Sequence, residues 1–390
     1  MRFNQPRHPI LIVGGGIAGL AAGYALRELG VSYRIFERFP RPGGRLNSRE
    51  GKGWIADHGA PYIMRSDQIV QDLIRYVGME TQRVVVQGGV YHLLPDNRIE
   101  VPPGGSIDPD RECIEQGFAE LFRRMGTQLG VTTGIAVGAA RWDDDEKTFW
   151  WQKEGQVFWL EDEEGLPISD PGTRDPLVGS GVILATTATA ARRICERSAS
   201  LQGVAERLAG VTYNSTFTAL FRVPRVDFPW FALDGMGHPR LLMVTLEDRK
   251  APQRTAPDTS LLVVHCTGEW SKELIGRRDP HEAMRAVYDE LRRVVVPLPE
   301  EPISQAYKKW HVSRPTSPPL GFPATADNPR GRWPTNPPHV PFALAGEYLL
   351  GRRAEDAARS GLLAAQSVLS QLPKTRTVLG IRTPPEYPMP

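Results

Sequence analysis

The sequence is poor in cysteine, and its few cysteines stand alone. Among its 390 residues are 3 cysteines, none of them in a CxxC pair: Cys113, Cys195 and Cys266. Isolated cysteines argue against a disulfide framework or a cysteine-based zinc site, and they fit a reducing compartment. The sequence also offers no Ser/His/Asp triad, metal-ligand cluster or P-loop lysine, so we expect no bound metal.

Charge excess and long apolar runs are missing as well. The chain has 47 Lys and Arg against 45 Asp and Glu, so no global field favours nucleic acid or an anionic membrane. No apolar run approaches the ~20 residues that cross a bilayer, and residues 1–9 are too short and polar for a signal peptide. We therefore expect a cytoplasmic protein with no nucleic-acid partner and no transmembrane segment. Its oligomeric state is left open.

The sequence does contain a strand, glycine turn, helix and strand near its start. The strand 10–13 leads into the turn, and a helix over 20–29, a strand over 33–36 and Glu37 follow. The turn itself consists of Gly14, Gly15, Gly16, Ile17, Ala18 and Gly19. Its glycines suit a tight turn, a close backbone approach to a pyrophosphate and close packing of the helix on the sheet.

Glu37 stands about twenty residues after these glycines, where its carboxylate can accept hydrogen bonds from both ribose hydroxyls. The pattern therefore predicts a dinucleotide site. The alternative is a glycine-rich structural turn, and the pattern alone leaves NAD and FAD equally open.

Two small-residue segments follow. The basic loop 38–45 ends in paired glycines and an arginine, which suit a pyrophosphate; the alternative is a solvated loop. In the segment 54–63, Gly59 and Ala60 permit the close approach of a planar ring. Near the other end of the chain, a strand over 342–347 ends in Gly346 and Glu347, and a helix over 354–365 follows.

These segments together resemble the FAD-dependent amine oxidase superfamily and, within it, renalase and its bacterial and plant relatives. The resemblance begins with the N-terminal pattern and continues through nearly the whole chain. Its further motifs are Gly43-Gly44-Arg45, Asp57-x-Gly59-Ala60-x-Tyr62, Gly346-Glu347, Val263-Val264-His265 and Lys308-Lys309-Trp310.

The resemblance implies FAD as the cofactor. It assigns the backbone of Val137 to the adenine, Glu347 to the ribityl chain or a phosphate, and the helix start near Ala357 to the flavin C2 carbonyl. A positive helix end stabilises the charge of a reduced flavin there, although Asp356 stands where the family usually has Gly. The complete set of expected FAD contacts is Gly14, Gly15, Gly16, Ile17, Ala18, Gly19, Glu37, Arg38, Gly44, Arg45, Gly59, Ala60, Pro61, Tyr62, Val137, Gly346, Glu347 and Ala357.

The implied fold is α/β: a Rossmann-like FAD-binding domain with an inserted α+β substrate (cap) domain, as in p-hydroxybenzoate hydroxylase and amine oxidase-type flavoproteins. The expected FAD-binding domain comprises 1–75, 128–190 and 335–375, the cap domain comprises 76–127 and 191–334, and 376–390 is a tail. Periodicity predicts helices over 66–79, 113–129 and 280–294. Strands are expected over 84–101, 131–137, 149–160, 181–187, 213–223, 241–246 and 261–266, and irregular chain over 161–180 and 312–341.

Five residues are candidates for the chemistry beside the flavin: His265, Lys309, Trp310, Tyr62 and Tyr213. His265 lies on an apolar strand, where a histidine is more often a satisfied core residue. The alternative for Lys309 is a solvent-facing lysine. Hydride transfer to a flavin needs alignment more than an acid or base, so a site with few titratable groups is compatible with this chemistry.

No second GxGxxG pattern is present, so NAD(P)H, if used, binds directly as a substrate. We therefore expect a renalase-type oxidase that passes a hydride from an NAD(P)H isomer or related small molecule into FAD and electrons on to O2. One alternative is a flavin amine oxidase, a dehydrogenase or a desaturase. The other is a non-catalytic flavin-binding regulatory or assembly protein.

Overall fold

The computed structural model describes residues 6–103, 108–142, 157–169, 176–321 and 340–372. Contacts divide the chain into two compact units: unit 1 is Met1–Pro42, Gly126–Val211 and Pro318–Pro390, and unit 2 is Gly43–Met125 and Thr212–Ser317. The boundaries of the predicted FAD-binding and cap domains remain a prediction. Parts of the predicted ribbon 149–160 and of the irregular chain over 161–180 and 312–341, and the tail 376–390, lie outside the described residues.

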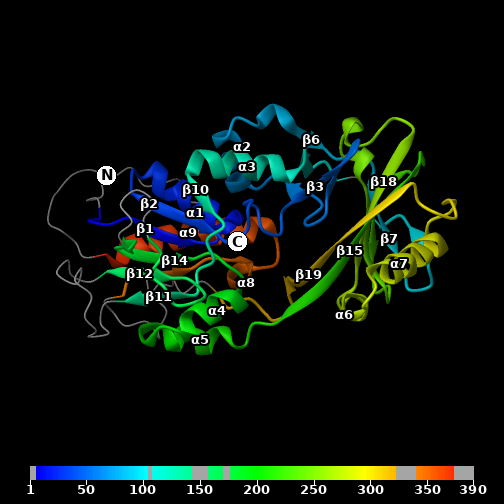
Figure 1. Cartoon of the computed structure of the whole chain (residues 1–390). Helices are drawn as coiled ribbons and strands as arrows, with labels where there is room; N and C mark the ends of the chain where they lie inside the picture. The colour runs from blue at the N-terminus through cyan, green and yellow to red at the C-terminus, as the bar shows by residue number, and fades with distance from the viewer. Residues whose placement is uncertain (1–5, 104–107, 143–156, 170–175, 322–339, 373–390) are drawn as a thin grey trace. The chain divides into compact units, whose positions relative to one another are not determined.

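Unit 1 contains a parallel sheet of five strands in the order β10-β2-β1-β14-β20 (Figure 1). Its central strand is β1 (Ile10–Val13), whose four residues are all buried. A continuous apolar run is typical of a parallel strand covered on both faces. The other strands are β2 (Tyr33–Glu37), β10 (Val131–Thr133), β14 (Gly181–Leu184) and β20 (Phe342–Leu344).

The two ends of the chain meet in the helices of unit 1. Helix α1 (Ile17–Glu28) packs against α9 (Ala354–Gln371). A Cβ atom on Gly361 would lie 2.0 Å from the carbonyl oxygen of Ala18, so the two helices touch backbone to backbone. The remaining helices of this unit are α4 (Ala188–Glu196), α5 (Gln202–Leu208), α8 (Glu347–Leu350) and a 3-10 turn over Ala199–Leu201.

A small antiparallel sheet completes unit 1. It consists of β11 (Ala139–Trp142), β12 (Phe158–Glu161) and β13 (Val178–Gly179). The Trp142 and Phe158 rings pack with their centroids 4.7 Å apart. Both side chains are buried, so these aromatic residues stabilise the sheet by packing.

Unit 2 contains a mixed sheet of seven strands in the order β19-β15-β18-β17-β16-β7-β8. Its pairs are antiparallel except β16 with β7. The strands are β7 (Gly89–Leu93), β8 (Ile99–Glu100), β15 (Tyr213–Pro224), β16 (Trp230–Gly235), β17 (Leu241–Leu246), β18 (Thr259–Cys266) and β19 (Ser304–Pro315).

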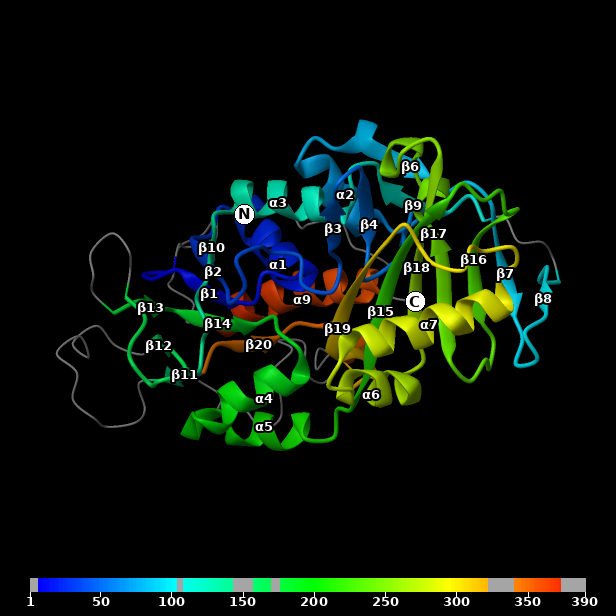
Figure 2. The same cartoon turned by 45° about the vertical axis from the view of Figure 1, so that its right-hand side comes forward.

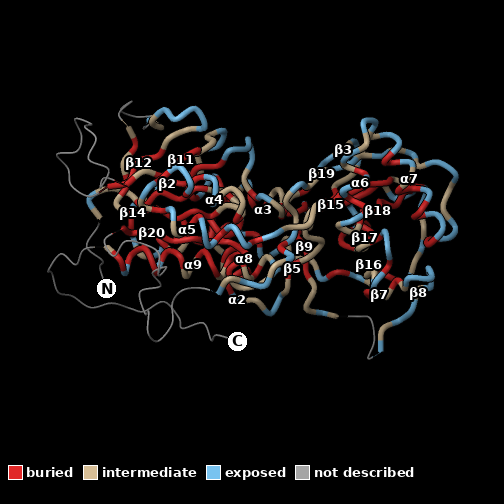
Figure 3. Tube along the Cα trace, turned by 90° about the horizontal axis from the view of Figure 1, so that it is seen from below, coloured by how far each residue is buried: buried red, intermediate tan, exposed pale blue. Residues whose placement is uncertain are grey.

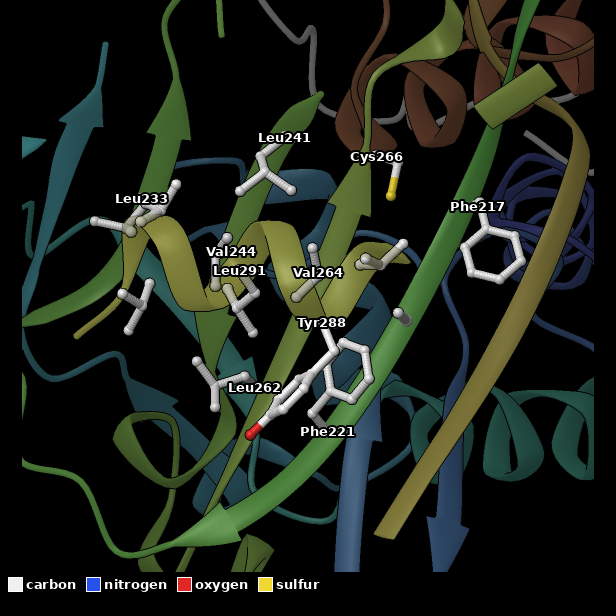
Figure 4. Packing of buried hydrophobic residues seen from close by; sticks show 14 of the residues in the cluster. Phe217, Phe221, Leu233, Leu241, Val244, Leu262, Val264, Cys266, Tyr288 and Leu291 are labelled. Carbon is white, nitrogen blue, oxygen red and sulfur yellow. The ribbon is translucent and has the colours of Figure 1, made fainter. Parts of the chain in front are cut away.

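Helices α6 (Gly268–Gly276) and α7 (Pro280–Val294) cover one face of this sheet (Figure 2). Phe221 and Leu262 from the strands pack with Tyr288 and Leu291 from α7 (Figure 4). This apolar core leaves the opposite face of the sheet for other contacts, and part of it packs on β4 through Leu261, Val263 and Ala56.

Central and edge strands of this sheet differ in burial (Figure 3). Strand β18 is buried along its whole length, whereas the edge strand β19 has one buried residue, Pro315. The expectation of irregular chain from residue 312 is wrong for 312–315. The backbone there pairs with β15, where Tyr213 lies opposite Pro315, and the prolines beyond it gave no sign of that pairing.

The rest of unit 2 surrounds these strands. It contains β3 (Ser48–Gly51), β4 (Trp54–Asp57), β5 (Ile63–Met64), β6 (Arg83–Val85), β9 (Arg111–Ile114), α2 (Gln68–Tyr76) and 3-10 turns over Glu80–Gln82, Glu247–Arg249 and Pro252–Arg254. Helix α3 (Phe118–Leu129) starts in this unit. The prediction of a helix from Cys113 is wrong at its start, because β9 pairs with β5 on one side and β6 on the other.

Candidate active site

The glycine turn after β1 is shaped by backbone contacts. Gly14 has φ +112, and a Cβ atom there would lie 2.3 Å from the carbonyl oxygen of Ala185. A Cβ atom on Gly19 would lie 1.9 Å from the carbonyl oxygen of Gly14. By contrast, a Cβ atom on Gly16 would meet nothing within 4 Å. The turn is therefore packed against the protein at Gly14 and Gly19 and open at Gly16, the position expected to face a pyrophosphate.

Glu37 ends β2 as a buried carboxylate. Its Oε2 accepts a hydrogen bond from the Gly15 N–H at 2.8 Å, and its Oε1 accepts one from the Phe39 N–H at 2.9 Å. Each carboxylate oxygen has two lone pairs, so both oxygens keep capacity to accept from a ribose hydroxyl. The residues present thus fit a dinucleotide.

Two other expected contacts in unit 1 lie near the end of β2. Val137 follows β10 in a half-buried loop, and the N–H of Ile135 in that loop donates to the Glu37 carbonyl at 3.0 Å. The predicted strand over 131–137 stops at Thr133 because Gly134 has φ +78. Arg38 is about half exposed and lies 3.9 Å from the Glu163 carboxylate.

The far end of the chain contributes Gly346, Glu347 and the start of α9. Glu347 is buried and begins α8, while the Gly346 N–H donates to Ser360 Oγ at 2.8 Å. Ala357 lies in the first turn of α9 and is buried. The Asp356 carboxylate accepts hydrogen bonds from the N–H groups of Arg352 and Arg353, both at 2.9 Å. The carboxylate that departs from the family pattern therefore caps its own helix.

In unit 2, the Gly44-Arg45 and Gly59-Ala60 segments lie against each other. A Cβ atom on Gly59 would lie 1.9 Å from the Arg45 carbonyl oxygen, which also accepts from the Ala60 N–H at 3.3 Å. The Arg45 guanidinium donates to the Ser313 carbonyl at 2.7 Å and lies 5.9 Å from the centroid of the Tyr213 ring. The Tyr213 ring therefore lies beside the Arg45 guanidinium.

Pro61 and Tyr62 follow this contact and are half-buried. The Tyr62 ring meets the Phe231 ring edge-on at 6.2 Å, and the Arg111 guanidinium lies 5.4 Å from its centroid.

One face of the seven-stranded sheet carries polar and aromatic groups, and we call it the imidazole face. It comprises His265 on β18, Thr216 and Thr218 on β15, Lys308 and Trp310 on β19, and His58 just after β4. In the sheet register, Thr218 lies opposite both His265 and Lys308, and Thr216 lies opposite Trp310.

The two histidines of this face are both 8% exposed. His265 Nδ1 hydrogen-bonds Thr218 Oγ1 at 3.2 Å. The rings of His58 and Trp310 lie 5.3 Å apart, and Trp310 Nε1 donates to the His58 carbonyl at 3.2 Å. Neither His58 Nδ1 nor His265 Nε2 has a hydrogen-bond partner among the described residues.

Both imidazoles are neutral at physiological pH. Burial lowers the pKa of His265 to about 3, and the charges of Lys250 and His58 act in the same direction. Burial also lowers the pKa of His58 to about 4, assisted by Lys308 and partly offset by Asp57. Each ring can therefore offer one donor or one acceptor nitrogen to a ligand.

Lys309 does not join the imidazole face. It lies opposite Phe217 in the sheet register, and its Nζ donates to the carbonyl of Ile275 on α6 at 3.2 Å. Alternation along β19 places Lys309 on the helix-covered face and Lys308 and Trp310 on the other.

A cluster of four buried charges beside His58 was not predicted from the sequence: Asp57, Glu247, Lys250 and Arg254, all essentially unexposed. Lys250 Nζ lies 3.0 Å from Asp57 Oδ2 and 2.8 Å from Glu247 Oε1, and Arg254 bonds both carboxylates. The Arg254 guanidinium shifts the Asp57 pKa well below its usual range, overcoming the effect of burial. The only available signal was the spacing of Glu247, Lys250 and Arg254 directly after an apolar strand.

The described residues contain no group of three or more His, Cys, Asp or Glu that could hold a metal ion. Among the same residues, no helix combines the length and hydropathy needed to span a bilayer.

The parallel sheet, the open glycine turn and the carboxylate that ends β2 define a Rossmann-type dinucleotide-binding protein with a second, mixed-sheet unit. Residues 12–77 match the NAD(P)-binding Rossmann-like domain. Residues 114–369, more than half of the chain, match the family described as flavin containing amine oxidoreductase. The chain belongs to the flavin-containing amine oxidoreductase family. The predicted superfamily and fold class are thus confirmed.

The similar proteins match this chain either over a short segment or at low sequence identity. Protoporphyrinogen oxidase 2 of Arabidopsis thaliana is 34% identical over 101 residues, which is 24% of this chain and 20% of that enzyme. Cyclohexylamine oxidase from Brevibacterium oxydans has a TM-score of 0.67 at 14% identity, covering 93% of this chain and 99% of that one. Reduced UDP-galactopyranose mutase has a TM-score of 0.66 at 12% identity, covering 93% and 95%. At this low identity, the similarity to these two structures shows a shared fold.

Proposed function

We propose that this protein is an FAD-dependent oxidase of renalase type. Its substrate would be a dihydronicotinamide, an isomer of NAD(P)H, oxidised to NAD(P)⁺. When bound, FAD would supply the redox chemistry: the hydride would pass to it, and two electrons with two protons, one from that hydride and one from solvent, would convert O2 to H2O2. Family membership supports the flavin, and the open turn at Gly16 with the carboxylate of Glu37 suits its dinucleotide part.

The imidazole face carries the choice of substrate. Trp310 offers an aromatic surface for a planar ring, and His58 and His265 beside it are uncharged. Lys308 Nζ lies 5.0 Å from the centroid of the Trp310 ring, so an ammonium substrate would meet a like charge. The Asp57 carboxylate next to His58 is held by Lys250 and Arg254. A neutral ring attached to anionic phosphates therefore suits this face better than an amine.

The test uses the purified flavin-loaded protein. Mixed without oxygen with 2- or 6-dihydronicotinamide adenine dinucleotide, it should lose the visible flavin absorbance, and admitting O2 should restore the absorbance with one H2O2 formed per substrate. Cyclohexylamine and benzylamine serve as the comparison substrates. Absence of bleaching with both dihydronicotinamides, or faster bleaching with an amine, would contradict the proposal.

A further inference from the structure

The two unpartnered nitrogens of the imidazole face are unusual within an otherwise satisfied region. Buried polar atoms are nearly always hydrogen-bonded, and a buried group without a partner costs more than a made bond contributes. In the same region Thr218 Oγ1 hydrogen-bonds His265 Nδ1, and Ser313 Oγ accepts from Thr216 at 2.9 Å. The Trp310 indole N–H donates to the His58 carbonyl. Among these described groups, only the buried atoms His58 Nδ1 and His265 Nε2 have no hydrogen-bond partner.

The two nitrogens come from separate parts of unit 2 that are connected through strands β15 and β19. His58 leans on Trp310, and Trp310 is one strand away from the Thr216 and Thr218 row that borders His265. A ring that packs on Trp310 beside His58 would have to direct its carboxamide along the Thr216 and Thr218 row to meet His265.

We propose that His58 Nδ1 and His265 Nε2 recognise the carboxamide of the substrate ring. A primary carboxamide has both an N–H₂ donor and a carbonyl acceptor. It can therefore satisfy two neutral imidazoles when one of their nitrogens donates and the other accepts. This inference rests on the proposed function, because it assigns residues to the dihydronicotinamide substrate. In this role both histidines are substrate-binding groups rather than acids or bases.

The experiment measures binding by calorimetry on the flavin-loaded full chain with two probes. Benzamide has a ring and a carboxamide, while acetophenone has a ring and a carbonyl but no N–H₂. Wild type should bind benzamide about tenfold more tightly, the size expected for hydrogen bonds to otherwise unpaired groups. His265→Phe and His58→Phe should remove most of this preference, and His265→Gln, whose amide can still bond, should restore part of it.

His311→Phe is the matched control, since His311 is exposed on β19 next to Trp310. A merely structural role of the histidines would weaken both probes equally and leave their ratio unchanged. An unchanged ratio in both Phe variants, or no preference in wild type, would overturn the inference. If His265→Phe does not fold, His265→Gln and His58→Phe carry the same comparison.

The test is independent of the proposed reaction. A benzamide preference that the Phe variants lose, in a protein whose flavin no dihydronicotinamide bleaches, would uphold carboxamide recognition and contradict the oxidase reaction. Flavin bleaching by a dihydronicotinamide with an unaltered KM in both Phe variants would uphold the reaction and overturn the recognition.

Discussion

The two sheets of this protein carry function in different ways. In the parallel sheet of unit 1, strands β1 and β14 are apolar and fully buried, and the features proposed to bind the cofactor are backbone turns and the Glu37 carboxylate at the strand ends. In the mixed sheet of unit 2 one face is covered by helices and the other presents side chains. In the proposed function, the cofactor site depends on glycine geometry, while the substrate preference depends on which side chains occupy the imidazole face.

The largest effect should come from the buried charges of unit 2. Arg254→Met leaves the Asp57 and Glu247 carboxylates buried with only Lys250, so it should lower the free energy of unfolding by about 3–5 kcal/mol. Denaturant unfolding measures this, and Arg254→Met/Glu247→Gln should recover part of the loss. Arg98→Met, which removes the exposed pairs with Asp96 and Glu100, is the control and should have no measurable effect. Equal effects at both arginines would contradict this account.

The glycine turn of unit 1 should respond next. Gly19→Ala brings a methyl group against the Gly14 carbonyl and should destabilise the fold by about 1–3 kcal/mol or more. Gly210→Ala has no neighbours within 4 Å and should be neutral. Thermal unfolding compares the two variants. A neutral Gly19→Ala would mean that the helix is not held against the turn.

Acid should destabilise the protein through the imidazole face before it affects the carboxylates. The pKa values of His58 and His265 are lowered to about 4 and about 3, so between pH 6.5 and 4 the unfolded chain binds protons that the folded chain does not. Stability should therefore fall as the pH falls through this window, by up to about 1.4 kcal/mol per unit for each imidazole. His58→Phe and His265→Phe should flatten the curve measured by denaturant unfolding. An unchanged slope in both would contradict neutral burial.

Lys309 should have the smallest effect. Its amine bonds a carbonyl of α6 on the helix-covered face, so Lys309→Gln should leave the rate of flavin bleaching by a dihydronicotinamide unchanged. Trp310→Leu, on the imidazole face, should slow it. Stopped-flow absorbance measures the bleaching rate in the two variants. A large loss of rate in Lys309→Gln would contradict this account and indicate that Lys309 lies beside the flavin.

The sequence predicted what depends on local chemistry. The strand, glycine turn and helix over Ile10–Val13 and Ile17–Glu28 need only their own residues, and so does the acid at the end of β2. The pairing of segments that are distant in the chain could not be predicted from the sequence. Cys113 lies on a strand because two other strands flank it. The Asp57 cluster reads in sequence as charged turns because Asp57 lies 190 residues before Glu247.

The candidate chemistry residues divide in the same way. His265 was predicted from its strand and Trp310 from the family resemblance, and the two share one face. His58 was overlooked because a histidine beside an aspartate gives no periodic signal. The opposite orientation of Lys309 follows from strand alternation, but only once the register of β19 with β15 is known.

The division of labour between the two units is tested most directly by one titration of the flavin-free protein with FAD, followed by visible absorbance, in wild type, Gly16→Ala and His265→Phe. A Cβ atom on Gly16 would occupy the open side of the turn, so Gly16→Ala should weaken FAD binding by about tenfold or more, equivalent to about 1.4 kcal/mol. His265→Phe should bind FAD as wild type does. Equal FAD affinity in Gly16→Ala and wild type, or loss of FAD in His265→Phe, would contradict the assignment of the cofactor to the glycine turn and of the substrate to the imidazole face.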